Sequence, residues 1–189
     1  MKFISYIYDN IESYGIMTNN ENSIIPMNAI LDKINKESTT NLLEFIEVYS
    51  NNITDEIEQA LNDFEFDCID TKEVKIIAPI KYPRRNIFCL GKNYAEHVLE
   101  VKSTSLGTES KLPDYPIYFT KIADPAIGHN DQVIIPKDYT YRIDYEVELA
   151  LVIGKDGKNI SPENAEEYIF GYTIGNDISA RDVQTKHTQ

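Results

Sequence analysis

The sequence has few cysteines, few basic residues and no long hydrophobic run, and each shortage excludes a class of protein. Its two cysteines, Cys68 and Cys89, lie in apolar stretches and are too few for a disulfide framework, which predicts buried free thiols in a reducing cytosol. The 18 basic residues against 31 acidic ones give a net charge of −13, which disfavours nucleic-acid and anionic-membrane partners. The longest apolar run, residues 149–153, is too short to cross a bilayer, and no signal-peptide core follows Met1. We therefore expect a soluble, cytoplasmic protein.

Glycine and proline are also scarce in the first part of the chain. Only Gly15 and Pro26 precede residue 75, whereas seven of the eight glycines and seven of the eight prolines follow it. This shift predicts a small N-terminal domain over residues 1–75 and a second region over residues 76–189. Hydrophobic residues make up 42% of the chain and charged residues 26%, which is typical of a globular protein.

The N-terminal domain has the patterns of both strands and helices. Strands are predicted over Lys2–Tyr8 and Ser13–Thr18, and helices near Met27–Ile34, Asn41–Tyr49 and Thr54–Asp63. An extended connector follows over residues 76–83, because its two prolines disfavour helix in the residues before them.

After the connector the patterns of strands dominate. We expect strands near residues 86–90, 116–120, 132–135 and, longest of all, 144–153. Helical patterns are limited to residues 94–101, 162–168 and 178–184. The predicted fold class is therefore α+β, with a small α+β N-terminal domain followed by the beginning of a mainly β domain.

Two acids stand two residues apart at the start of the long predicted strand. Strand alternation places Glu146 and Glu148 on one face, followed by Ala150 and Val152, and the apolar residues Val147, Leu149, Leu151 and Ile153 on the other. Neighbouring carboxylates repel each other, and a hard cation such as Mg²⁺, Ca²⁺ or Mn²⁺ between them removes that repulsion. The same pattern also fits a solvent-facing strand start whose acids form salt bridges.

A second polar group follows an apolar strand pattern near the end of the chain. Asp177 stands where that strand passes into a predicted helix, a position where ligand sites collect and where aspartate also caps helices. Asp177, Arg181 and Gln184 would share one face of this helix. Arg181 could bind a carboxylate through two hydrogen bonds, or pair only with Asp177 or Asp182.

A third group lies where a strand pattern breaks at Gly91. His97 and Glu100 are three residues apart and would be neighbours on one helical face. A carboxylate beside a histidine fixes its tautomer and raises its basicity, which suits a general base. A surface His–Glu pair without a catalytic role is the alternative.

The order of these groups resembles the signature of the fumarylacetoacetate hydrolase family. Four motifs carry the resemblance, which covers residues 76–189: Gly91-x-Asn-Tyr-x-x-His-x-x-Glu100, Pro116-x-x-Phe-x-Lys121, Asp144-Tyr-Glu-x-Glu-Leu149, and Gly171-Tyr-Thr-x-x-Asn-Asp-x-Ser-Ala-Arg-Asp-x-Gln184.

The resemblance implies a Mg²⁺-dependent enzyme acting on 2-oxo acids, on a barrel-like β roll that dimerises when complete. It implies metal ligation by Glu146, Glu148 and Asp177, with Mn²⁺ or Ca²⁺ as substitutes, and catalysis by the His97–Glu100 pair. Substrate contacts fall to Arg181, Gln184 and Lys121. Acylpyruvate hydrolysis, oxaloacetate decarboxylation and isomerisation of 2-hydroxyhepta-2,4-diene-1,7-dioate share a metal-stabilised enolate, so the motifs do not separate them.

The resemblance also implies that the family's catalytic domain continues beyond the last motif, into a segment with another active-site lysine. The expectation from the sequence is therefore a C-terminally truncated catalytic domain. The alternative to an enzyme is a non-catalytic fragment that keeps part of the fold and of the metal site.

Overall fold

The computed structural model describes residues 1–94, 113–184 and 186. They form two compact units. The first comprises residues 1–81, 125–133 and 147–175, and the second comprises the described parts of 82–124, 134–146 and 176–189.

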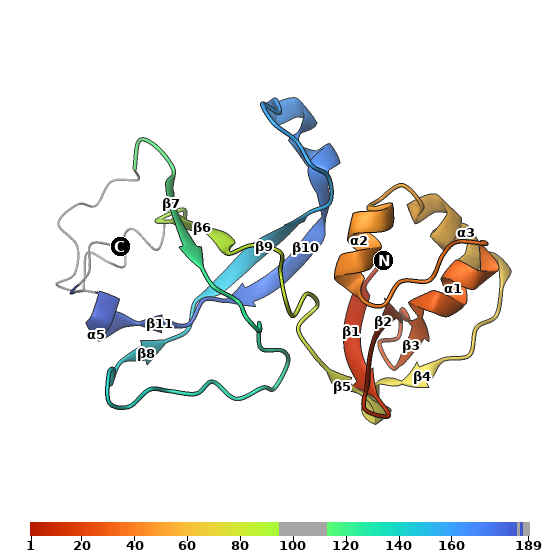
Figure 1. The fold of residues 1–189 in the computed structure, drawn as a ribbon, viewed down its shortest axis with the longest axis horizontal. Helices are drawn as coiled ribbons and strands as arrows, with labels where there is room; N and C mark the ends of the chain where they lie inside the picture. Colours follow the sequence, from red (N-terminus) through yellow and green to blue (C-terminus); the bar gives the residue numbers. More distant parts are fainter. Residues whose placement is uncertain (95–112, 185, 187–189) are drawn as a thin grey trace. The chain divides into compact units, whose positions relative to one another are not determined.

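The first unit is built on a five-stranded antiparallel sheet in the order β4-β3-β2-β1-β5 (Figure 1). A two-residue turn joins β1 to β2, where Asp9 and Asn10 have positive φ values of 49° and 64°. Such turns match the twist of the strands they connect. The strands are β1 (Phe3–Tyr8), β2 (Ile11–Met17), β3 (Ser23–Pro26), β4 (Ile69–Asp70) and β5 (Lys75–Ile76).

Three helices pack against this sheet and confirm the three that the sequence predicts: α1 (Met27–Lys33), α2 (Leu42–Tyr49) and α3 (Thr54–Asp63). The Asn41 side chain caps α2 by accepting a 3.0 Å hydrogen bond from the Glu44 N–H, and the Glu44 carboxylate accepts one from the Thr40 N–H. The core lies between helices and sheet and includes Tyr14, Ile16, Met27, Ile30, Leu31, Phe45, Ile46 and Ile57.

A later part of the chain joins this core. Strands β9 (Val147–Ile153) and β10 (Ile169–Asn176) pair with each other, and a 3₁₀ helix over Pro162–Tyr168 lies between them in sequence. The Phe170 ring lies 5.1 Å from the Phe3 ring and 6.2 Å from the Phe45 ring, measured between centroids. The first unit therefore takes core residues from both sides of the division expected at residue 75, and that domain division stays a prediction.

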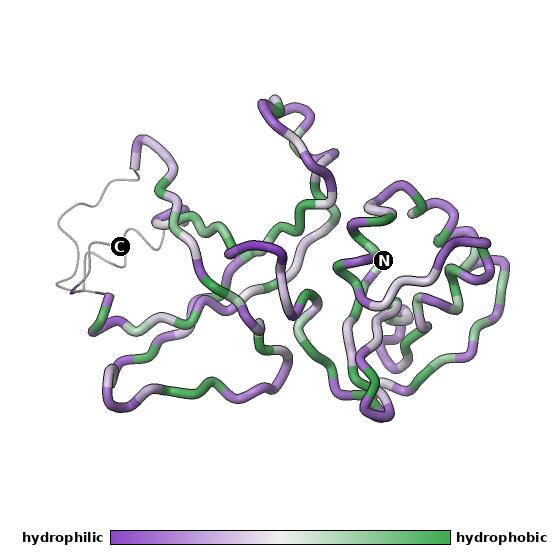
Figure 2. The backbone as a smooth tube through the Cα atoms, in the orientation of Figure 1, coloured by the Kyte–Doolittle hydropathy of each residue, from purple (hydrophilic) through white to green (hydrophobic). Residues whose placement is uncertain are grey.

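The alternation predicted for β9 is confirmed, and its apolar face is exposed. Val147, Leu149, Leu151 and Ile153 are 69%, 59%, 51% and 61% accessible, whereas Glu148, Ala150 and Val152 between them are half-buried. On β10, Tyr172 and Ile174 are also exposed. Figure 2 shows that hydrophobic stretches continue well beyond the helix-covered N-terminal part.

The second unit is built from two short antiparallel pairs. Strand β6 (Ile87–Gly91) pairs with β7 (Ile117–Lys121), and β8 (Ile143–Asp144) pairs with β11 (Ser179–Ala180). A single helical turn, α5 (Arg181–Gln184), follows β11 directly. Mixed helices and strands confirm the predicted α+β class.

Three predicted elements differ from the structure. The strand expected over 144–153 is interrupted at residues 145–146, because Glu146 bonds to residues 176–177. The helix expected over 178–184 begins only at Arg181, because Ser179 and Ala180 pair with β8. No strand forms over 132–135, which has no ladder partner among the described residues.

Cys68 is exposed, so the prediction that both thiols are buried is wrong, while Cys89 is partly buried. Across the part of the chain that the structure describes, no helix is long and apolar enough to span a membrane.

Candidate functional site

The candidate site lies in the second unit, where the segment after β8 meets the segment after β10. The Asp177 N–H donates a 2.8 Å hydrogen bond to the Glu146 carbonyl, and the Glu146 N–H donates a 3.2 Å bond to Asn176 Oδ1. Ser179 faces Asp144 in the β8–β11 pair. These contacts bring two short acidic segments together although they are about 30 residues apart in sequence.

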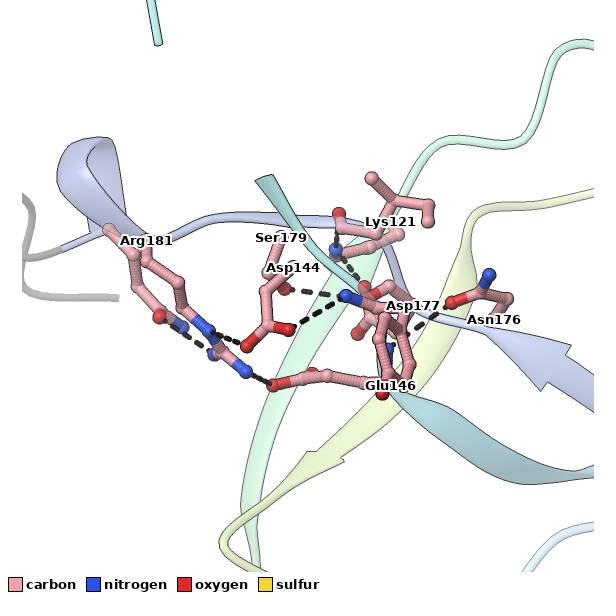
Figure 3. A network of polar contacts seen from close by, with 10 residues as sticks. Lys121, Asp144, Glu146, Asn176, Asp177, Ser179 and Arg181 are labelled. Carbon is pink, nitrogen blue, oxygen red and sulfur yellow. Dashed lines mark hydrogen bonds and ion pairs between the residues drawn. The ribbon is translucent and has the colours of Figure 1, made fainter. Parts of the chain in front are cut away.

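Arg181 joins two acids of this site through its guanidinium (Figure 3). Its Nε donates a 2.9 Å hydrogen bond to Asp144 Oδ2, and its Nη2 forms a charged hydrogen bond with Glu146 Oε1. Its Nη1 donates a 3.1 Å bond to Gln184 Oε1. Burial opposes the charge of Arg181, but the bonds to Asp144 and Glu146 outweigh burial and raise the pKa of the guanidinium. Arg181 is therefore a fixed cation here.

Lys121 supplies a second cation from the end of β7. Its Nζ forms an ion pair with Asp177 Oδ1 and donates a 3.0 Å hydrogen bond to the Ile178 carbonyl. The Asp177 side chain is only 11% accessible, and its Oδ1 is the oxygen that contacts the Lys121 ammonium. A carboxylate oxygen has two lone pairs, so Oδ1 can accept a further electrophilic partner beside Lys121.

A buried pair supports the backbone beneath this network. Asp182 is 7% and Thr140 4% accessible, and the Thr140 hydroxyl donates a hydrogen bond to the Asp182 carboxylate. The Tyr141 N–H also donates to Asp182, at 3.3 Å, and the Arg181 N–H donates to the Arg142 carbonyl, at 2.9 Å. The hydrogen bond from Thr140 is the main cause that lowers the pKa of Asp182. The pair ties the start of α5 to the segment that leads into β8.

The structure brings together five of the residues predicted from sequence: Lys121, Glu146, Asp177, Arg181 and Gln184. Arg181, Gln184 and Asp177 do not share a helical face as predicted, because Asp177 precedes β11 and α5 begins at Arg181. Arg181 pairs with Asp144 and Glu146 rather than with Asp177 or Asp182. His97 and Glu100 lie outside the described residues.

The sequence did not predict the roles of three residues of the site. Asp144 binds Arg181, and Thr140 and Asp182 support the backbone beside it. Asp144 left a signal, because it stands two residues before Glu146, at the same spacing that separates Glu146 from Glu148. Thr140 left none, because its role depends on a partner 42 residues away.

The three predicted metal ligands match a divalent cation in chemistry. No group of three or more His, Cys, Asp or Glu side chains is placed to hold a metal ion within the described part of the chain. Glu146 and Asp177 belong to the second unit and Glu148 to the first, so the convergence of the three stays a prediction. The chemistry fits, because all three supply hard carboxylate oxygens and Asp177 Oδ1 retains acceptor capacity.

Fold and site define an α+β protein with an acidic polar site that contains lysine and arginine. Residues 86–189 match the family model described as fumarylacetoacetate (FAA) hydrolase C-terminal. The chain therefore belongs to the fumarylacetoacetate hydrolase family.

Individual relatives agree with this membership. The chain is 49% identical over 117 residues to oxaloacetate tautomerase YisK of Bacillus subtilis (strain 168), an alignment that covers 62% of this chain and 37% of that protein. The fumarylacetoacetate hydrolase of Exiguobacterium antarcticum superposes with a TM-score of 0.69 at 31% identity, covering 100% of this chain and 60% of that one.

A 5-carboxymethyl-2-hydroxymuconate delta-isomerase of Mycobacterium smegmatis superposes with a TM-score of 0.64 at 26% identity, covering 100% of this chain and 59% of that one. The chain thus spans between about a third and three fifths of the length of these relatives.

Proposed function

We propose that this chain provides the metal and substrate site of an enzyme that interconverts the keto and enol forms of a 2-oxo acid, with oxaloacetate as the substrate. The observation that carries the proposal is the 49% identity to an oxaloacetate tautomerase. The network around Arg181 and Lys121 supports it, because a dicarboxylate needs cationic side chains beside a site for a hard cation.

In this proposal Glu146, Glu148 and Asp177 would hold one Mg²⁺, and Mn²⁺ or Ca²⁺ could replace it. The bound cation would act as a Lewis acid that polarises the 2-oxo group of the substrate. Its carboxylate ligands then no longer need the side-chain cations that hold Glu146 and Asp177 in this structure.

The side chains of the site have separate tasks. Arg181 binds a substrate carboxylate through its terminal N–H groups, and Gln184 orients that end of the guanidinium. The Lys121 ammonium stabilises the negative charge that develops on the substrate oxygen at C2.

His97, oriented by Glu100, moves the proton. It removes the proton from C3 while the C2–C3 bond becomes double, and the oxygen on C2 gains a proton, so the reaction is an isomerisation without an added reactant. Three alternative reactions develop the same negative charge on the oxygen at C2. They are hydrolysis of acylpyruvates, decarboxylation of oxaloacetate and isomerisation of 2-hydroxyhepta-2,4-diene-1,7-dioate.

The test is the ultraviolet absorbance of enol-oxaloacetate as it relaxes to keto-oxaloacetate, with and without the protein. We expect acceleration that requires Mg²⁺, disappears with a chelator and falls by about 100-fold or more in His97→Ala. Relaxation at the buffer rate with Mg²⁺, Mn²⁺ and Ca²⁺ alike would exclude the activity.

A second candidate is binding of the cation and of a 2-oxo acid without turnover. The coverage of the relatives favours it, because the alignment with the tautomerase spans 37% of that protein and so does not extend over the whole of that enzyme. Calorimetry distinguishes the two candidates: binding of Mg²⁺ and oxalate without any acceleration of enol relaxation supports the second.

A further inference from the structure

Asp144 has no task in the function proposed above, yet it is the partner of one edge of Arg181. Its Oδ2 accepts the 2.9 Å hydrogen bond from Nε, while Glu146 and Gln184 engage the terminal nitrogens. We propose that Asp144 is the positioning residue of Arg181, which fixes the plane of the guanidinium so that its terminal N–H groups meet a carboxylate of the 2-oxo acid. This inference rests on the proposed function.

The shape of the guanidinium explains how an anchor on Nε acts on the terminal donors. The group is planar, and its five N–H donors point in fixed directions. A partner on Nε therefore sets the directions of the four terminal donors. Glu146 and Gln184 hold some of these donors in the present structure. A divalent cation on Glu146 would release Nη2, whereas Nε would keep its bond to Asp144.

Asp144 is itself held in place from two sides. Its backbone pairs with Ser179 in the β8–β11 ladder, two residues before Arg181. Its other carboxylate oxygen, Oδ1, accepts a 3.0 Å hydrogen bond from the Tyr145 N–H. Asp144 therefore lies on β8, and Arg181 directly follows β11, the strand paired with β8, so the backbone sets the separation of the two residues.

The accessibility of the side chains agrees with Asp144 as the anchor and the terminal N–H groups of Arg181 as the substrate contacts. The Asp144 side chain is 46% accessible, whereas the Arg181 side chain is 18% accessible and that of Glu146 22%. Asp144 holds Arg181 from the solvent side of the network. A substrate carboxylate that binds the terminal donors need not displace Asp144 from Nε.

The first test compares Asp144→Ala with Asp144→Glu and with Asp138→Ala, an exposed aspartate in the same unit. With Mg²⁺ present, Asp144→Ala should raise the KM for oxaloacetate and the Kd for oxalate about tenfold and change kcat by less than about twofold, because it removes binding that ground state and transition state share. Asp144→Glu should restore both constants to within about threefold. Asp138→Ala should match the parent protein.

The second test observes the arginine without any turnover. The Nε–H resonance of Arg181 in a ¹⁵N spectrum, identified by its loss in Arg181→Lys, should shift and broaden in Asp144→Ala and stay in place in Asp138→Ala. Should Asp144→Ala fail to fold, Asp144→Asn, which keeps the size but not the charge, provides the measurement.

The outcomes separate this inference from the function on which it rests. An Nε–H resonance that is unchanged in Asp144→Ala, or an unchanged KM, overturns the positioning role. A parent protein that neither accelerates enol relaxation nor binds oxalate contradicts the proposed function, and the resonance then decides alone whether Asp144 holds Arg181.

Discussion

Arg181 divides its guanidinium between two acids, and one of them, Glu146, is a proposed metal ligand. A divalent cation must therefore compete with a resident cation for this carboxylate. We expect Arg181→Gln to bind Mg²⁺ about three- to tenfold more tightly, because a partly exposed ion pair contributes on the order of 1 kcal/mol. Calorimetry with Mg²⁺ alone measures the effect.

Arg142→Gln is the matched control for this prediction, since it removes an exposed arginine from the same unit and changes the net charge equally. An equal gain in Mg²⁺ affinity in the two variants would show that long-range charge alone causes the effect. An affinity that falls in Arg181→Gln would mean that Arg181 orders Glu146 for the metal.

The Thr140–Asp182 pair predicts a pH dependence of stability. Hydrogen bonds in the folded state lower the pKa of Asp182 below its ordinary value of 3.8. A depressed carboxylate pKa stabilises the fold above the unfolded-state value, and this contribution is lost as the pH falls through the folded-state value. In Asp182→Asn we expect a smaller loss of stability below about pH 4 than in the parent protein.

Thermal unfolding between about pH 2.5 and about pH 6 measures this difference, with Asp138→Asn as control. The parent and Asp138→Asn should lose melting temperature along parallel curves on acidification, and Asp182→Asn should start lower and fall less. A curve for Asp182→Asn that stays parallel to the other two would contradict the assignment.

At the scale of elements, β10 contributes to the core of the first unit through one aromatic ring. Phe170 packs against both Phe3 and Phe45, whereas Tyr172, two residues further along the strand, is 61% accessible. We expect Phe170→Ala to lower the free energy of unfolding by about 2 to 3 kcal/mol, because it leaves a cavity among packed rings. Tyr172→Ala should change it by less than about 0.5 kcal/mol. Urea unfolding followed by circular dichroism compares the two variants. Similar losses of unfolding free energy in both would mean that the packing of the Phe170 ring is not the main stabilising contact of β10.

Elements determined by nearby residues could be predicted from the sequence, and those determined by distant partners could not. The cap at Asn41 and the helix after it depend on residues three or four positions apart. The interruption at residues 145–146 depends on Asn176 and Asp177, and the strand at Ser179 depends on its pairing with Asp144, far earlier in the chain. Alternation and helical periodicity describe one segment at a time, so they do not contain this information.

The same distinction applies to the site. The residue types in four ordered motifs indicate Lys121, Glu146, Asp177, Arg181 and Gln184 as candidate site residues, and the structure places these five in one network. The pairing among them was not predictable, because the contacts of Arg181 with Asp144 and Glu146 follow from the β8–β11 ladder. Asp144 could have been found by extending the two-residue spacing of Glu146 and Glu148 backward.

At the scale of the whole molecule, the exposed apolar face of β9 predicts association. Four aliphatic side chains on one strand face, each more than half accessible, form a surface that water solvates poorly and that a second chain can cover. We expect the 189-residue chain to elute from size-exclusion chromatography with light scattering as dimers or larger species. Leu149→Glu combined with Leu151→Glu should shift it toward the monomer, and two exposed changes elsewhere, such as Asn164→Glu and Asn62→Glu, should not. A monomeric parent chain at high micromolar concentration would contradict this prediction.

The balance of charge around Arg181 also bears on the sequence in which ligands arrive. Asp144, Glu146 and Asp177 carry three negative charges, and Arg181 and Lys121 carry two positive ones, so the cluster has a net charge of −1. An approaching dianion is repelled by this cluster, whereas a divalent cation is attracted and offsets its negative charge. The network therefore favours a compulsory order in which the cation enters first and the acid second. In stopped-flow measurements, a protein equilibrated with Mg²⁺ would capture oxalate rapidly, and one mixed with both at once would show a delay set by the arrival of the cation.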